Sequence, residues 1–451
     1  MASSRECVIF ARVKSGDALE LDLDALGPAG EGTGPRDDRT IHVHGGFPGE
    51  RVDVRVVNVS RQRPLAHAEL RKVVTPHPGR RPSPCIHHDT GEPGKRKQTL
   101  CTGCPLLSLA VTDQRAHKQA LLAREYGLQV DQVVASPQEF GYRWSSKRVV
   151  GGTPGHLVLG SYVRGSHTLA AMHACQVDHP EVVLAAEELR RVADSLAIEP
   201  ATLTGPEHSS TGDLRYAWFK TDGRDVLLTL VTASDDSRAA RELPERLRRP
   251  AGIAWSIQPS HGNNLRGQPA QILRGKPELA LELAGVPRAT GPLGFLQPNP
   301  EVAALAYADL VRGPDGAELT GPLALDLYAG AGVTTQLLRR QFTEVRPCEA
   351  YPESAAALGI PPEPAESFLK TQSETPTLVI ANPPREGLGP QVCAELLRLA
   401  PQRLHIMSCG PAGLARDLAT LAARFRLVAL RAYDTLPHTP HVELVAWLES
   451  T

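Results

Sequence analysis

The sequence predicts an α/β protein in three parts: a small all-β barrel, a mixed α/β middle region and a doubly wound parallel sheet. Three observations lead to this prediction. Apolar and polar residues alternate over residues 39–75, a helical period runs through residues 110–127, and strand-like runs followed by helix-like runs begin after Gly291. We place the parts at residues 1–75, 76–290 and 291–451.

The composition is typical of an ordinary globular protein. The 451 residues are enough for two or three domains, and 41% are hydrophobic and 22% charged. No apolar run approaches the roughly 18 residues needed to span a membrane. The N-terminal segment MASSRECVIF lacks the charged and apolar regions of a signal peptide, so we expect a cytoplasmic protein.

Charge is distributed unevenly along the chain. The net charge is −1, yet residues 51–150 carry 17 Lys and Arg against 8 Asp and Glu, which leaves the remainder acidic. A basic module on an acidic body is expected for docking on a polyanion such as RNA. A solvated basic surface without a partner is the alternative.

The first part has turn signals at Gly45-Gly46 and Pro48-Gly49 between its alternating runs, which favours a five-stranded barrel. Barrels of this kind often bind RNA. Basic residues in and after it are candidate phosphate contacts, although each could equally be a plain surface charge. They are Arg61, Arg63, Arg71, Lys72, Arg80, Arg81, Lys95, Arg96 and Lys97.

The segment LALDLYAGAGVTTQLL (323–338) combines a buried strand, a glycine turn and a helix start. Gly330 and Gly332 would let the backbone approach a nucleotide-like cofactor at the carboxyl end of a sheet. Asp326 precedes the turn, and Glu349 follows the next strand-like stretch. An acidic side chain there could accept both ribose hydroxyls of an adenosine, although Glu349 could also be a surface carboxylate.

Five segments carry a resemblance to a known family. They are GFLQPN (294–299), DLYAGAG (326–332), ANPPREGL (381–388), SCGPAGLARDL (408–418) and DTLPHTPHVE (434–443). In content and order they resemble the motifs of the RNA uridine-5-methyltransferase family, especially its bacterial 23S ribosomal RNA members with an N-terminal TRAM domain.

The resemblance implies methylation of carbon 5 of a uridine, with S-adenosylmethionine as the methyl donor. It also implies a Rossmann-like fold for residues 291–451 and an OB-like TRAM barrel for residues 1–75. The implied catalytic residues are Cys409 and Glu443. The implied cofactor-binding residues are Gln297, Asp326, Tyr328, Gly330, Gly332, Glu349 and Asn382.

This chemistry needs a thiol and a base, because carbon 5 of uracil is a poor nucleophile until a thiolate adds to carbon 6. Cys409 follows the apolar run RLHIMS at a predicted strand end, where exposure and a helix N-terminus favour a thiolate. Taken alone, such a cysteine is more often a buried structural residue. Glu443 interrupts an apolar strand and must be partnered or functional. By resemblance it is the base.

The sequence departs from the family pattern in three places. Asn382 stands where the family usually has Asp, and Val333 where many relatives have Asn. Ala412-Gly413 replaces a small residue followed by Thr. The asparagine keeps an acceptor oxygen, whereas the valine removes one polar contact to the cofactor.

Four of the eight cysteines follow the pattern of the family's iron–sulfur members. Cys85 lies upstream of the pair Cys101 and Cys104 in CTGC, and Cys175 lies much later. The resemblance implies a structural [4Fe–4S] cluster, with structural zinc as the alternative. Fifteen residues separate Cys85 from Cys101, more than is usual, and include the basic stretch GEPGKRKQT. We expect Cys7, Cys348 and Cys393 to be ordinary thiols.

The target base must be flipped out or lie in a loop to reach a buried thiol. Phe295 is the candidate for stacking on RNA, with a core role as the alternative. Three other functions stay open: a transfer RNA substrate, an amino-group methyltransferase suggested by Asn382-Pro383-Pro384, and a non-catalytic RNA-binding or assembly factor. Arg385 occupies the position that is aromatic in amino-group methyltransferases. We expect a monomer.

Overall fold

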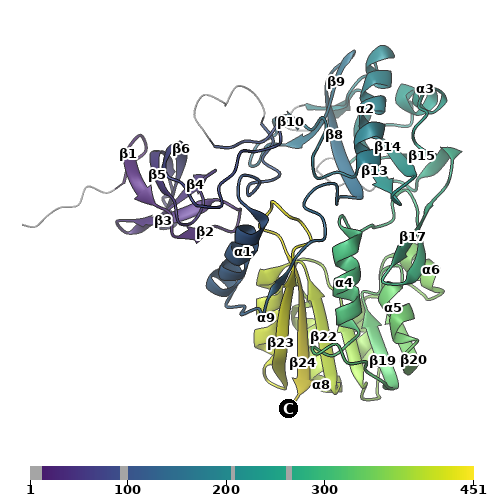
Figure 1. Cartoon of the computed structure of the whole chain (residues 1–451). Coiled ribbons are helices and arrows are strands. Elements are labelled where there is room, and N and C mark those ends of the chain that lie inside the picture. Colours follow the sequence, from purple (N-terminus) through teal and green to yellow (C-terminus); the bar gives the residue numbers. More distant parts are fainter. Residues whose placement is uncertain (1–12, 92–99, 205–208, 261–266) are drawn as a thin grey trace, which may run out of the picture. The chain divides into compact units, whose positions relative to one another are not determined.

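Figure 1 shows the computed structural model, which describes residues 13–91, 100–204, 209–260 and 267–451. The chain forms two compact units. Unit 1 comprises Met1–Leu121 and His438–Pro440, and unit 2 comprises Leu122–Pro437 and His441–Thr451. Cys7, Lys95, Arg96 and Lys97 lie outside the described residues.

Unit 1 contains a six-stranded sheet in the order β1-β5-β6-β4-β3-β2. Its strands are β1 (Ala18–Asp22), β2 (Ala25–Leu26), β3 (Gly32–Arg36), β4 (Arg39–His44), β5 (Arg51–Val59) and β6 (Leu65–Thr75). The segment just after β1 meets β3 across this sheet, since Asp24 donates its N–H to the carbonyl of Thr33 (2.9 Å). The alternating apolar residues, such as Ile41 and Val54, fill the interior as predicted. The two-residue strand β2 makes six strands among the described residues where we predicted five.

Glu50 ties the segment after β6 to this sheet. Its buried carboxylate accepts hydrogen bonds from Nε and Nη2 of Arg80 and from the N–H groups of Phe47 (2.9 Å) and His77 (3.1 Å). Arg80 therefore neutralises a buried carboxylate, which removes it from the predicted phosphate contacts. The predicted residues Arg61, Arg63, Arg71 and Lys72 are exposed.

The helix predicted over residues 110–127 is confirmed as α1 (Val111–Tyr126).

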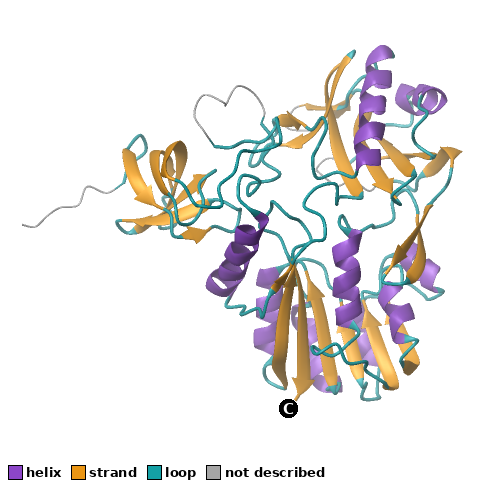
Figure 2. Cartoon of the chain, viewed as in Figure 1, coloured by secondary structure: helices purple, strands orange, loops and turns teal. Residues whose placement is uncertain are grey.

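The first large sheet of unit 2 has the order β10-β9-β8-β13-β14-β15-β16. Its strands are β8 (Ser145–Thr153), β9 (His156–Tyr162), β10 (Leu169–Ala171), β13 (Leu214–Thr221), β14 (Val226–Thr232), β15 (Gly252–Ile257) and β16 (Gln271–Gly275). Helices α2 (Pro180–Ser195) and α3 (Arg238–Arg246) pack on one face (Figure 2). Two hairpins accompany this sheet: β11 (Thr202–Thr204) with β12 (Ser209–Thr211), and β17 (Leu279–Leu283) with β18 (Val286–Thr290).

The second large sheet has the order β20-β19-β21-β22-β24-β23-β7. Its strands are β7 (Val133–Val134), β19 (Gly321–Leu327), β20 (Phe342–Cys348), β21 (Leu378–Ala381), β22 (Arg403–Ser408), β23 (Phe425–Tyr433) and β24 (Glu443–Ser450). Helices α4 (Pro300–Leu310) and α5 (Val333–Leu338) cover one face, and α7 (Ala365–Thr371), α8 (Gly389–Leu399) and α9 (Pro411–Leu421) cover the other. The short helix α6 (Pro352–Leu358) follows β20.

This sheet confirms the predicted α/β fold with helices on both faces, and it departs from the predicted parallel arrangement at one strand. Strands β20, β19, β21 and β22 are parallel, whereas β24 runs antiparallel to both β22 and β23. The segment between β23 and β24 contains no helix, and a direct return of this kind pairs strands antiparallel.

Among the described residues, no helix is both long enough and apolar enough to cross a membrane.

Candidate active site

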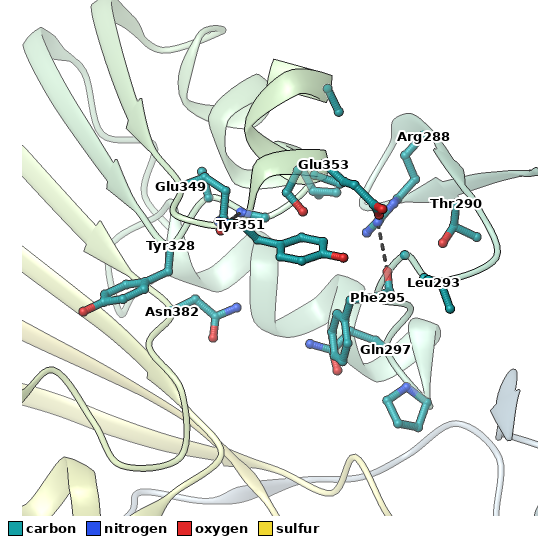
Figure 3. Close-up of a pocket in the computed structure, with 18 of the residues that line it drawn as sticks. Arg288, Thr290, Leu293, Phe295, Gln297, Tyr328, Glu349, Tyr351, Glu353 and Asn382 are labelled. Atoms are coloured by element: carbon teal, nitrogen blue, oxygen red, sulfur yellow. Dashed lines mark hydrogen bonds between the residues drawn. The ribbon is translucent and has the colours of Figure 1, made fainter. Parts of the chain in front are cut away.

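A cavity of about 980 Å³ opens in unit 2 at the carboxyl ends of the parallel strands. Ligands bind at this edge in open α/β sheets. The loops that follow β19, β20, β21 and β22 contribute to its wall, as does the segment that ends at Glu443 at the start of β24. A second wall comes from β18 and the segment that leads into α4 (Figure 3).

Seven of the nine predicted catalytic and cofactor-binding residues line this cavity. They are Gln297, Tyr328, Gly330, Glu349, Asn382, Cys409 and Glu443. Figure 3 shows Tyr328, Glu349 and Asn382 on one side, and Arg288, Phe295 and Gln297 on the other. Residues more than a hundred positions apart therefore share one cavity.

Glu349 joins the end of β20 to the glycine loop after β19. One carboxylate oxygen accepts the N–H of Gly330 (2.8 Å), and the other accepts the N–H of Tyr351 (2.6 Å). Gly330 has φ +57°, and a Cβ built there would meet no atom within 4 Å. The loop therefore presents open backbone next to a carboxylate, as a nucleotide-like ligand requires.

Asp326 and Gly332 do not line the cavity. Asp326 is buried, and one of its oxygens accepts the hydroxyl groups of Thr334 (2.8 Å) and Thr335 (2.5 Å). Burial raises the pKa of its carboxyl to about 6. Gly332 has φ +81°, and a Cβ there would lie 2.3 Å from Cδ2 of Leu358. In the structure both residues support the conformation of the glycine loop and do not face the cavity.

Cys409, Glu443 and Arg385 meet in the same cavity. Burial and the Glu443 carboxylate raise the pKa of the Cys409 thiol, and the Arg385 guanidinium opposes them. Burial also raises the pKa of Glu443, which is 7% exposed, to about 8, again against the effect of Arg385. Contrary to the expectation that the strand end favours a thiolate, desolvation and the Glu443 charge outweigh the Arg385 cation at Cys409.

The loop that carries Arg385 is held by α9. Asp417 accepts the N–H groups of Leu388 (2.7 Å) and Gly389 (3.3 Å). A Cβ at Gly410 would lie 2.0 Å from the Arg385 carbonyl oxygen, so only glycine fits this approach. The sequence motifs contain Arg385 and Asp417, but neither was assigned a site role. The sequence does contain a signal for Asp417, because this charged residue lies among apolar residues of the segment that forms α9.

Gln297 and Phe295 form the opposite wall. Nε2 of Gln297 donates to the hydroxyl of Tyr307 (3.2 Å), and Nη2 of Arg288 donates to the Phe295 carbonyl (3.1 Å; Figure 3). Phe295 is 56% exposed, which excludes a core role. Val333, a departure from the family pattern, is buried and also lines the cavity.

Within the part of the chain that the structure describes, the cysteines of the predicted cluster form no disulfide bond. Cys85, Cys101 and Cys104 belong to unit 1, and Cys175 belongs to unit 2. The described residues include no group of three or more His, Cys, Asp or Glu side chains arranged to hold a metal ion. Cys348 and Cys393 are buried, as expected for ordinary thiols.

Comparisons with known proteins identify the family. Residues 370–451 match the tRNA (uracil-5-)-methyltransferase family model. An uncharacterised RNA methyltransferase of Geobacter sulfurreducens is 30% identical over 96% of this chain and 90% of its own. The 23S rRNA (uracil(1939)-C(5))-methyltransferase of Alkalilimnicola ehrlichii is also 30% identical, over 95% of this chain and 96% of its own.

The fold has a counterpart among solved structures. The tRNA (uracil-54, C5)-methyltransferase of Pyrococcus abyssi, in complex with S-adenosyl-L-homocysteine, superposes with a TM-score of 0.71 at 24% identity. The match covers 95% of this chain and all of the other, and it shows that the two proteins share a fold. On the sequence relationships, the chain is an enzyme of the RNA (uracil-5-)-methyltransferase family.

Proposed function

We propose that the protein methylates carbon 5 of a uridine in 23S ribosomal RNA through a covalent bond between Cys409 and carbon 6 of the base. The observation that carries the proposal is one cavity that contains Cys409, Glu443 and Arg385 together with the loop of Gly330 and Glu349. Two 30% identical relatives named as 23S rRNA methyltransferases, from A. ehrlichii and Shewanella amazonensis, support the choice of RNA.

The cofactor proposed is S-adenosylmethionine, which supplies an electrophilic methyl group when bound. Glu349, Gly330, Asn382 and Gln297 line the cavity and would hold it. The open space at Gly330 and the carboxylate beside it suit an adenosine with its ribose hydroxyls. Asp326 would act indirectly, since it holds the threonines that follow the loop.

The reaction proposed begins when the Cys409 thiol loses its proton to solvent, its sulfur bonds to carbon 6 and the double-bond electrons move toward the oxygen on carbon 4. Carbon 5, now nucleophilic, would take the methyl group as the bond between that group and the sulfur of the cofactor breaks. Glu443 then removes the proton from carbon 5, the double bond reforms, and the bond between sulfur and carbon 6 breaks. Arg385 would stabilise negative charge on either protein group, because it lowers the pKa of both.

The order of these steps suits the electrostatics of the pair. The Glu443 charge raises the pKa of the Cys409 thiol, so the two negative charges oppose each other. A protonated Glu443 therefore favours the attacking thiolate. Once the sulfur is bonded to carbon 6 it carries no charge, and the carboxylate can form and act as the base.

An adduct assay tests the proposal. Fluorine at carbon 5 cannot leave as a proton, so 5-fluorouridine RNA mixed with enzyme and cofactor should stall as a covalent complex on a denaturing gel. Cys409→Ala should abolish the complex, and Cys393→Ala, which changes a cysteine outside the cavity, should retain it. Failure to form the complex with any RNA, despite measured cofactor binding, would contradict the mechanism.

The same assay separates the substrates. A complex with 23S rRNA and not with transfer RNA supports the proposal. The reverse result would favour the transfer RNA alternative, for which the P. abyssi enzyme named above is the precedent. RNA binding without any adduct would favour a non-catalytic factor.

We also propose, from the cysteine pattern alone, that Cys85, Cys101, Cys104 and Cys175 hold a structural [4Fe–4S] cluster, since uridine methylation transfers no electron. Anaerobic purification should yield brown protein with about four irons per chain, whereas bound zinc without iron would contradict it. The proposal includes a TRAM-type barrel that contacts RNA phosphates through residues such as Arg61 and Arg63, in a cytoplasmic monomer. Chromatographic sizing tests the last point.

A further inference from the structure

Lys220 is a buried lysine whose ammonium group lies outside the cavity but binds one of its walls. It is on β13 and 1% exposed. Its Nζ donates to three backbone carbonyls: those of Gly291 (2.6 Å), Pro292 (2.8 Å) and Gly294 (2.6 Å). Three carbonyls of one short loop therefore converge on one positive charge.

The alternation of β13 explains why Lys220 faces this loop. Tyr216, Trp218 and Lys220 are on the face opposite α2, and Leu293 of the loop packs with Tyr216 and Trp218. The ammonium also lies 4.0 Å from the centre of the Trp218 ring, a favourable cation–π distance. The loop 291–294 therefore packs on the face of the first sheet of unit 2 that is opposite α2 and α3.

A second side chain holds the same loop. The hydroxyl of Thr229, on β14, donates to the Pro292 carbonyl (3.1 Å). The loop sequence Gly-Pro-Leu-Gly has only one large side chain with which to anchor itself. Its position therefore depends largely on the donors that meet its carbonyls.

The loop leads directly into Phe295 and Gln297, which line the cavity. Gln297 is three residues beyond the last carbonyl that Lys220 binds. Burying an ammonium group costs desolvation free energy that hydrogen bonds must offset. All three donors of the Lys220 ammonium group have carbonyl partners. The hydrogen bonds of Lys220 therefore hold the part of the cavity wall that loop 291–294 forms.

We propose that Lys220 is a positioning residue for cofactor binding, which holds loop 291–294 so that Gln297 keeps its place in the cavity. The inference rests on the proposed function, in which Gln297 contacts the cofactor. A residue that serves only the fold would change stability without changing the affinity of the folded enzyme. A positioning residue changes the affinity itself.

The test is calorimetric binding of S-adenosylhomocysteine to the full chain and to three variants, each with a thermal melt. Lys220→Met removes all three hydrogen bonds and should weaken binding about tenfold or more. Thr229→Val removes one bond to the same loop without touching a charge, and should weaken binding about three- to fivefold, since one hydrogen bond is worth about 1 kcal/mol. Lys276→Met, one residue after the end of β16, removes a surface lysine paired with Asp225 and should bind like wild type.

Steady-state kinetics give a second readout. With Lys220→Met and Thr229→Val, the KM for the cofactor should rise more than kcat falls. Wild-type affinity in a folded Lys220→Met variant would overturn the inference. If Lys220→Met does not fold, Thr229→Val decides, and unchanged affinity there would overturn it as well. Absence of binding by wild type would instead show that the proposed function, and this inference with it, is wrong.

Discussion

The carboxylate of Glu349 accepts the backbone N–H of Gly330 at 2.8 Å, although the two residues follow different strands of the sheet. The glycine loop and the acidic residue are thus parts of one hydrogen-bonded unit. A substitution of Glu349 therefore changes the loop as well as the carboxylate itself.

Glu349→Gln should weaken cofactor binding at least tenfold. Both carboxylate oxygens accept backbone N–H groups, so an amide would turn its own NH₂ group toward one of them. Titration calorimetry with S-adenosylhomocysteine measures the loss. The matched control is Glu344→Gln, an exposed position on β20, the strand that Glu349 follows, where binding should not change. Equal affinities in the two variants would contradict the prediction.

Gly330→Ala and Gly332→Ala should separate cofactor binding from stability. Both glycines have a positive φ, which costs an alanine about 1–2 kcal/mol. At Gly332 the new Cβ also overlaps Leu358, whereas at Gly330 it enters the open cavity. Gly332→Ala should therefore show the larger drop in melting temperature. Gly330→Ala should show the larger loss of cofactor affinity relative to its drop in melting temperature. The opposite ranking in the melts would be inconsistent with this geometry.

The parts of the site that sequence predicts are those set by local pattern. A strand, a glycine turn and a helix start within 323–338 were predictable because each has a local signal. The direction of the Asp326 side chain was not, since it depends on threonines in the helix that follows. Arg80 is a similar case. Its charge predicted a phosphate contact, but its partner Glu50 is 30 residues away and buried.

The protonation of the Cys409 thiol likewise could not be predicted from local sequence. A strand end next to a helix N-terminus predicts a favoured thiolate. The opposing effects are burial of the thiol and, second, the charge of Glu443, which reaches the site from the next strand in the sheet, β24. Only the antiparallel placement of β24 beside β22 brings the two together, and the sequence had predicted parallel strands.

Asp417→Asn should reduce turnover with a modest loss of stability. The amide keeps one acceptor for Leu388 or Gly389 but loses the other, which costs about 1–2 kcal/mol. The loop from Arg385 to Gly389 would loosen, so kcat should fall several-fold. Single-turnover methylation, with melting temperature as the companion measurement, tests this. A variant with lower stability but wild-type kcat would show that Asp417 serves the fold alone.

Glu443→Gln should trap the enzyme on ordinary RNA. Without the base, the carbon 5 proton stays in place and the Cys409 sulfur cannot leave, so a covalent complex should accumulate without fluorine substitution. A denaturing gel with unmodified substrate RNA and cofactor detects it. The double variant Cys409→Ala with Glu443→Gln should form no complex. If the single variant turns over at the wild-type rate, Glu443 is not the base.

The buried carboxyl of Glu443 should make the stability of the enzyme depend on pH. Burial raises its pKa from 4.5 to about 8 in the folded protein, so the folded state binds the proton more tightly than the unfolded state. The contribution is therefore fully present below pH 4.5 and is lost as the pH rises toward and through 8. In Glu443→Gln this loss is absent, because the amide does not ionise. The variant should gain about 3–5 kcal/mol relative to wild type between pH 5 and pH 9.

Thermal or urea unfolding at several pH values measures that difference, with the transition of unit 2 followed by its tryptophans. All four tryptophans of the chain, Trp144, Trp218, Trp255 and Trp447, lie in that unit. Glu344→Gln serves as control. The pKa of its exposed carboxyl is lowered by Arg346, so the stability difference between this control and wild type should change only at acidic pH and stay constant between pH 7 and pH 9. Parallel curves for wild type and Glu443→Gln across the whole range would mean that Glu443 is ionised, and already partnered, in the folded enzyme at neutral pH.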